Sequence, residues 1–127
     1  MKWEDEELTN KIINCCVTVH KTLGSGFLEI IYHNALKIEL TKQGLMYETE
    51  KEVIITYDDI KVGKHRIDLL IEGKVVIELK AVDELSNKYY AQVRSYLNAL
   101  SLGTGLLVNF SMPTVDVRRV QPKRMGR

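Results

Sequence analysis

The chain has 127 residues, which suits one domain with a single hydrophobic core. Hydrophobic residues make up 45% and charged residues 28%, as in an ordinary globular protein. The formal net charge of +1 argues against a strongly basic nucleic-acid coat but is compatible with a local basic groove. No apolar run approaches the roughly 20 residues of a membrane helix, and the first ten residues lack a signal-peptide pattern. We therefore expect a cytoplasmic protein that does not enter a membrane.

Two helices are predicted in the first third of the chain. Apolar residues in 5–23 recur at the spacing of one helix face, and the segment GSG, residues 24–26, ends the pattern. A second helical pattern begins at Leu28 and continues until Gly44, which supplies a C-terminal stop. We expect the two helices to form a helical hairpin.

After the second helix the apolar pattern changes to a period of two, which is typical of strands. Strands are predicted at 47–57, 62–71 and 75–81, and the short turns between them imply antiparallel neighbours. A third helix is expected at 85–100, where Ser86 or Asn87 is suited to the N-cap. Further strands are predicted at 103–110 and 115–120.

The order of these elements, ααβββαββ, indicates an α/β (α+β mixed) domain with a central mixed sheet flanked by helices. We expect residues 1–120 to form this single domain. Residues 121–127 are basic, and we expect them to be a flexible tail. A tail that contacts phosphate groups is the alternative.

Charged side chains interrupt the buried strand VVIELKA, residues 75–81. Alternate side chains of a strand face opposite sides of the sheet, so Glu78 and Lys80 share one face. A three-residue turn at 72–74 would place Asp68 of the preceding strand directly opposite Glu78. Other short loops would shift this register by about one residue.

Two carboxylates that face each other on partly buried strands repel, and desolvation strengthens the repulsion. A divalent cation would neutralise both, and carboxylate oxygens suit Mg²⁺ or Mn²⁺ rather than zinc. The alternative is an ordinary salt-bridge network of Asp68 and Glu78 with Arg66 and Lys80. The apolar residues around both acids favour the metal site.

These residues resemble a known family. The segment RIDLLIEGKVVIELKA, residues 66–81, is similar to the core of the PD-(D/E)xK nuclease superfamily. The segment GFLEIIY resembles the motif of its GxxExxY family through Gly26, Glu29 and Tyr32. The resemblance implies a restriction-endonuclease-like fold.

The similarity continues in the second half of the chain. Gln92 and Tyr96, four residues apart on one helix face, resemble the QxxxY motif of the RecB-like branch, although a polar face beside a core stripe would have the same spacing. The segment GLLVNF, residues 105–110, also matches. Ser111 follows it where the family usually has glycine, which puts a turn in doubt and not the chemistry.

The resemblance implies a role for each site residue. Asp68 and Glu78 would bind the metal, with help from the backbone carbonyl of Leu79. Glu29 would hold the metal directly or through water, although the helix dipole alone also favours an acid there. Lys80 would orient or deprotonate the attacking water and steady charge on the phosphate. Gln92, Tyr96 and Tyr32 are implied to support the site or contact nucleic acid.

The function implied is a nuclease that uses Mg²⁺ or Mn²⁺ to hydrolyse the phosphodiester bonds of DNA or RNA. One alternative is a nuclease-like fold that binds nucleic acid or a protein without turnover. Another is a structural domain whose charges form only salt bridges. We also expect a homodimer, since many small nucleases pair to reach both strands. The histidines lack zinc-ligand spacing, but His33, four residues after Glu29, could touch the site.

Overall fold

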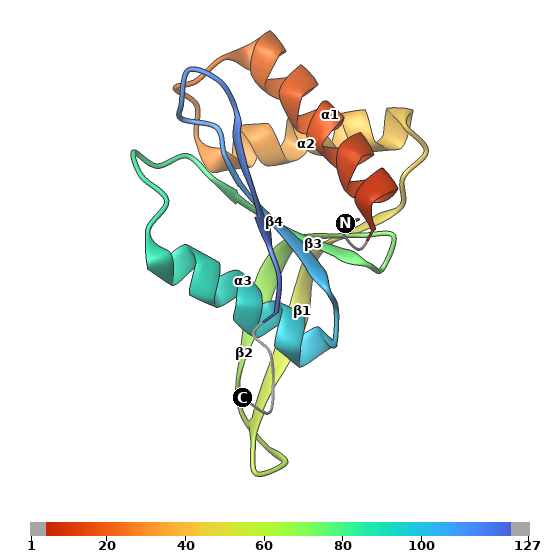
Figure 1. The fold of residues 1–127 in the computed structure, drawn as a ribbon, viewed down its shortest axis with the longest axis vertical. Coiled ribbons are helices and arrows are strands. Elements are labelled where there is room, and N and C mark those ends of the chain that lie inside the picture. Colours follow the sequence, from red (N-terminus) through yellow and green to blue (C-terminus); the bar gives the residue numbers. More distant parts are fainter. Residues whose placement is uncertain (1–4, 123–127) are drawn as a thin grey trace.

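Helices cover both faces of one five-stranded sheet in the computed structural model, which describes residues 5–122 (Figure 1). The elements follow the predicted order. The helices are α1 (Glu6–Leu23), α2 (Glu29–Lys42) and α3 (Asn87–Leu100). The strands are β1 (Tyr47–Tyr57), β2 (Ile60–Ile71), β3 (Val75–Lys80), β4 (Thr104–Asn109) and β5 (Asp116–Val120).

The strands lie in the sheet in chain order, from β1 to β5. The pairs β1–β2, β2–β3 and β4–β5 are antiparallel, while β3 and β4 are parallel. A parallel pair needs a crossover connection, and α3 supplies it. The predicted mixed sheet flanked by helices is therefore confirmed.

The sheet separates two hydrophobic clusters. Helices α1 and α2 cover one face, where Ile12 and Leu36 pack against β3 and β4 residues such as Ile77. Helix α3 covers the other face through Val93 and related residues. Both faces of the central strands are thus buried, as their continuous apolar pattern predicts.

Helix α3 approaches the sheet closely at Gly105 of β4. A Cβ atom there would lie 2.6 Å from Cγ1 of Val93, which is too short for two carbon atoms. A larger residue would push α3 away from the sheet. Glycine at this position therefore sets the distance between α3 and the strands that carry the charged residues.

The hairpin of β1 and β2 extends beyond the rest of the molecule (Figure 1). Its turn consists of Asp58 and Asp59, both in the left-handed region with φ of 52° and 61°. Such turns match the twist of antiparallel strands and favour Asp, Asn and Gly. The predicted turn is confirmed, but β2 begins at Ile60, two residues earlier than the apolar pattern indicated.

The predicted bounds of β1 are confirmed, and the remaining boundaries differ from the predictions by at most two residues at helix and strand ends, where capping and fraying decide the limit. Ser86 occupies the N-cap of α3, although its side chain makes no capping hydrogen bond. Most of the basic segment predicted as a tail, residues 123–127, lies outside the described residues. Within residues 5–122, no helix is both long and apolar enough to cross a membrane.

Candidate active site

Strands β2 and β3 stop pairing through their backbones at Asp68 and Glu78. The regular ladder joins Leu69 to Ile77, so the next opposed positions are Asp68 and Glu78. This is the register predicted for a three-residue turn. At this point the Asp68 amide donates to Oε1 of Glu78 at 3.0 Å, and the Leu79 amide donates to Oδ2 of Asp68 at 2.8 Å. The two carboxylates thus take the places that backbone carbonyls hold in a continuous ladder.

Glu78 as a residue is only 6% exposed, and a charge on its carboxyl group is unfavourable there. Burial raises the pKa of Glu78 to about 8, and the charges of Asp68 and Glu29 act in the same direction. The amide of Asp68 and the ammonium of Lys80 oppose the shift without cancelling it. Among the described residues, the positive charge near Glu78 therefore does not offset the effect of its burial.

The salt-bridge network considered as an alternative does not form. Arg66 pairs instead with Glu52 on the neighbouring strand, at 3.9 Å. The ammonium of Lys80 lies over the ring of Tyr89, 4.7 Å from its centroid. In the part of the chain that the structure describes, neither Asp68 nor Glu78 has a salt-bridge partner.

A cavity of about 200 Å³ opens beside Asp68 on the side of α2. Glu29, the first residue of α2, lines it together with Asp68 and Leu79. The predicted acid of the second helix is thus brought next to the acidic pair. Glu78 and Lys80 do not line this cavity, because their side chains share the sheet face that α3 covers.

Three further residues, Ile30, His33 and Glu50, line the same cavity, and Glu50 among them was missed by sequence reasoning. Glu50 faces Asp68 between the paired residues Thr49 and Lys51, but it has a left-handed φ of 49° and no ladder pair of its own. The register is the same on both sides of Glu50, so its left-handed backbone, and not an inserted residue, takes its side chain out of the regular alternation. Nothing in the alternation of β1 signals it.

His33 also lines the cavity. Its Nε2 atom lies 3.3 Å from the backbone oxygen of Asp68. Because a carbonyl only accepts, this nitrogen donates the hydrogen bond. The helical spacing from Glu29 was the signal for this contact, which places His33 beside Asp68.

Tyr32 is fully buried and closes the connection between α1 and α2. Its hydroxyl donates to the carbonyl of Gly24 at 2.6 Å and accepts from the amide of Phe27 at 3.3 Å. The ring stacks on Phe110 with centroids 4.5 Å apart. A supporting role, rather than contact with nucleic acid, therefore stays as the prediction for Tyr32.

Tyr96 is buried on α3 and close enough to the acidic pair to be affected by its charges, whereas Gln92 lies exposed one turn earlier. Burial, followed by the charges of Glu78 and Asp68, raises the pKa of Tyr96 to about 12. The ring of Tyr96 also lies 5.6 Å from that of His65, between centroids. The helix thus brings Tyr96 near the carboxylates but leaves Gln92 facing solvent.

The last residue of β4 and the residues just beyond it hold the segment that follows β3. The Asn109 side chain accepts from the amide of Val82 at 3.1 Å and donates to its carbonyl at 2.9 Å. The hydroxyl of Ser111 donates to the same carbonyl. The turn after β4 therefore forms with serine at position 111. Its hydroxyl makes a hydrogen bond that glycine could not make.

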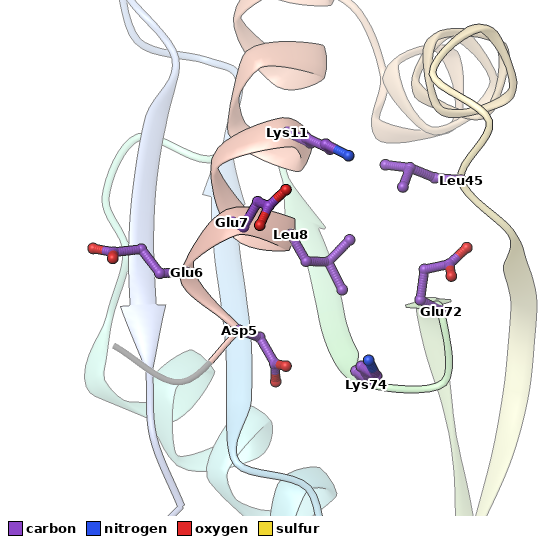
Figure 2. A pocket seen from close by; sticks show the side chains of 8 residues that line it. All are labelled: Asp5, Glu6, Glu7, Leu8, Lys11, Leu45, Glu72 and Lys74. Carbon is purple, nitrogen blue, oxygen red and sulfur yellow. The ribbon is translucent and has the colours of Figure 1, made fainter. Parts of the chain in front are cut away.

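A separate hollow of about 470 Å³ lies at the start of α1 and shares no residue with the site (Figure 2). Figure 2 shows its carboxylates pointing in different directions, with Lys11 and Lys74 among them. Glu72 accepts a hydrogen bond from the amide of Met46 at 2.5 Å. Across residues 5–122, no three His, Cys, Asp or Glu side chains are clustered closely enough to hold a metal.

The fold and the acidic pair define a nuclease-like α/β protein. A family model described as the PD-(D/E)XK nuclease superfamily matches residues 6–120, and the chain belongs to this superfamily. Its nucleases generally use divalent metals. The finer assignment to the GxxExxY family stays a prediction.

The chain is also similar to a solved structure titled "Crystal structure of SSO0001". The two are 22% identical with a TM-score of 0.61, and the match covers 95% of this chain. It covers 61% of the other chain, so this protein spans less than two thirds of that length. The likeness extends to the fold alone. No curated protein matches the chain.

Proposed function

We propose that the protein is a nuclease that uses Mg²⁺ or Mn²⁺ to hydrolyse phosphodiester bonds of DNA or RNA. The observation that carries this proposal is the pairing of Asp68 with buried Glu78 in a position where the described chain supplies neither with a salt-bridge partner. Such a pair is unfavourable alone and favourable around a cation.

The donor chemistry fits a hard divalent ion. Only one oxygen of each carboxylate accepts a hydrogen bond from the described chain, so Asp68 and Glu78 each keep a second oxygen as a ligand. We propose that the backbone carbonyl of Leu79 completes the set and that Glu29 joins it directly or through water. A divalent ion bound there would lower the pKa of its water and polarise a phosphoryl oxygen.

The remaining site residues would position the attacking water and the phosphate group. The ammonium of Lys80, as a donor, would orient the attacking water and stabilise negative charge on the phosphate. As the water oxygen bonds to phosphorus it gives up one proton, while the bond to the leaving oxygen breaks and that oxygen takes up one proton. Tyr96 and Tyr32 would hold the surrounding elements, and exposed Gln92 could contact the nucleic acid.

The alternative function is a nuclease-like module that binds nucleic acid or a protein without cleaving. It is favoured by the lack, within the described ranges, of a ready cluster of three metal-ligating side chains. Homodimer formation and a cytoplasmic location also stay proposals. Sedimentation of the purified protein would test the dimer.

The decisive experiment compares metal binding with cleavage. We expect Mn²⁺ to bind the wild type by calorimetry and to raise its melting temperature, since a ligand of the folded state stabilises it. Asp68→Ala and Glu78→Ala should lose this binding, whereas Glu84→Gln in the exposed loop before α3 should keep it. Undiminished binding in both alanine variants would rule out the proposed ligands.

Cleavage is measured on a panel of single-stranded, duplex and branched DNA and RNA. Metal-dependent cleavage that Lys80→Ala abolishes and Lys61→Ala does not would support the enzyme. Metal binding without cleavage of any substrate in the panel would favour the binding module.

A further inference from the structure

The ammonium of Lys80 is held at a defined place by an aromatic ring. Its Nζ atom lies 4.7 Å from the centroid of Tyr89, well within the range of a cation–π contact. The backbone of Lys80 is fixed as well, because its carbonyl accepts from the amide of Phe110 at 2.9 Å. Both ends of this half-buried side chain are therefore anchored.

The ring of Tyr89 is itself well supported. Tyr89 lies in the first turn of α3, where its amide donates to the carbonyl of Ser86 at 3.1 Å. It packs against the hydrophobic cluster beneath α3, four residues before Val93 and seven before Tyr96. This spacing puts its ring on the helix face that covers the acidic pair.

Without the ring, the ammonium has a competing partner. Glu78 lies two residues earlier in β3 on the same face, and Asp68 lies beside it. An unrestrained lysine near two carboxylates is expected to form an ion pair with them. Among the ion pairs of residues 5–122, however, none includes Lys80.

We propose that Tyr89 is a positioning residue, which holds the Lys80 ammonium over its ring and away from Asp68 and Glu78. This placement leaves the acid oxygens to the cation and the ammonium to the water and the phosphate. The inference rests on the proposed function for its catalytic consequence, but the position of the ammonium can be tested by itself.

A second lysine contacts the same ring. The Nζ atom of Lys88 lies 5.3 Å from the Tyr89 centroid, and Lys88 is exposed. Two ammonium groups near one ring repel each other, so Lys88 does not reinforce the hold on Lys80. Lys88→Ala is therefore expected to leave the contact between Lys80 and Tyr89 in place.

The catalytic test removes the ring and then restores it. Tyr89→Leu is expected to lower kcat by about two- to thirtyfold, the factor that corresponds to one cation–π contact, with little change in KM. Tyr89→Phe keeps the ring and should recover most of the activity. Tyr90→Leu, which removes a half-buried tyrosine from the same helix turn, is the matched control.

A packing role is separated from a charge-holding role by fluorinated phenylalanines at position 89. Each added fluorine weakens the negative face of the ring while its shape changes little, so kcat should fall stepwise with fluorination. This series also serves if Tyr89→Leu fails to fold. A kcat that does not respond to fluorination, or a Tyr89→Phe variant as impaired as Tyr89→Leu, would overturn the inference.

Proton NMR tests the contact without any substrate. The Lys80 methylene protons should be shielded by the ring current in the wild type and in Tyr89→Phe, and lose that shielding in Tyr89→Leu. Unchanged shifts in Tyr89→Leu would overturn the inference even in an active enzyme. If no nucleic acid is cleaved, the proposed function fails, and the proton shifts still decide where the ammonium lies.

Discussion

Two acidic regions of the molecule differ in burial and hydrogen bonding more than in their number of carboxylates. In the hollow at the start of α1, the acids are half-buried or exposed, and two lysines line the same space (Figure 2). At the β2–β3 junction, Glu78 is buried and each acid of the pair accepts an amide from the opposite strand.

This difference between the two regions shows that the pairing register of two strands can bring acidic side chains together at one place. Acids at a helix start are favoured by the helix dipole and stay in contact with water, so they need no ligand. Strand pairing, by contrast, holds half-buried Asp68 beside buried Glu78, where water screens their charges less than at an exposed surface. Of the two arrangements, the proposed cation would offset the unfavourable charge of the second.

The largest effect is expected from substitutions that remove one carboxylate of the Asp68–Glu78 pair. Asp68→Asn or Glu78→Gln should reduce metal-dependent cleavage by about a thousandfold or more, because metal catalysis is worth several kcal/mol. Initial rates on the panel at saturating Mn²⁺ measure this effect. Glu6→Gln and Glu7→Gln in the hollow are the matched controls, and an equal loss in them would contradict the distinction between the regions.

The next largest effect is expected from substituting Lys80, and it is compared with the same substitution of Lys74 in the hollow. Lys80→Ala should lower kcat by about a hundredfold, the typical contribution of a group that handles protons or developing charge. Affinity for Mn²⁺, measured by calorimetry, should change little, because Lys80 is not a ligand. Lys74→Ala in the hollow is the control and should match the wild type. A kcat that survives Lys80→Ala would remove this lysine from the mechanism.

The third prediction concerns pH and stability in the absence of metal. The pKa of Glu78 rises from 4.5 to about 8 on folding, so between these values the folded state holds a proton that the unfolded state has released. The stabilisation is therefore complete below about pH 4.5 and is lost as pH rises through 8. We expect the loss to be on the order of a few kcal/mol.

Urea unfolding in EDTA at several pH values measures this effect as the difference between wild type and Glu78→Gln, which cannot titrate. Glu7→Gln should follow the wild type at every pH. Parallel curves for the wild type and Glu78→Gln would contradict the raised pKa.

The smallest effect concerns strain beside the pair. Glu50 adopts a left-handed conformation that costs an ordinary residue about 1–2 kcal/mol and costs glycine little. Glu50→Gly should therefore be about 1 kcal/mol more stable than Glu50→Ala in urea unfolding. At Glu52, which has no positive φ, glycine should be the less stable of the two. The same order at both positions would argue against strain at Glu50.

Much of the fold could be predicted because each element carries its own periodic signal. The change from a helical to a strand period marks β1, and the short turn at 72–74 is enough to bring Asp68 opposite Glu78. Glu50 could not be predicted, since strand alternation places it with Glu48 and Glu52 on an exposed edge. Tyr89 could not be predicted either, because its contact depends on how closely α3 approaches β3.

Sequence by itself determined the elements, their order and the chemistry available at the β2–β3 junction, because these depend on neighbours a few residues apart. Tertiary structure alone decided that Glu29, His33 and Glu50 meet at one cavity beside Asp68. It also decided that Lys80 lies on an aromatic ring and not in a salt bridge. Both outcomes depend on distances between elements far apart in the chain, which packing across the sheet sets and local patterns do not encode.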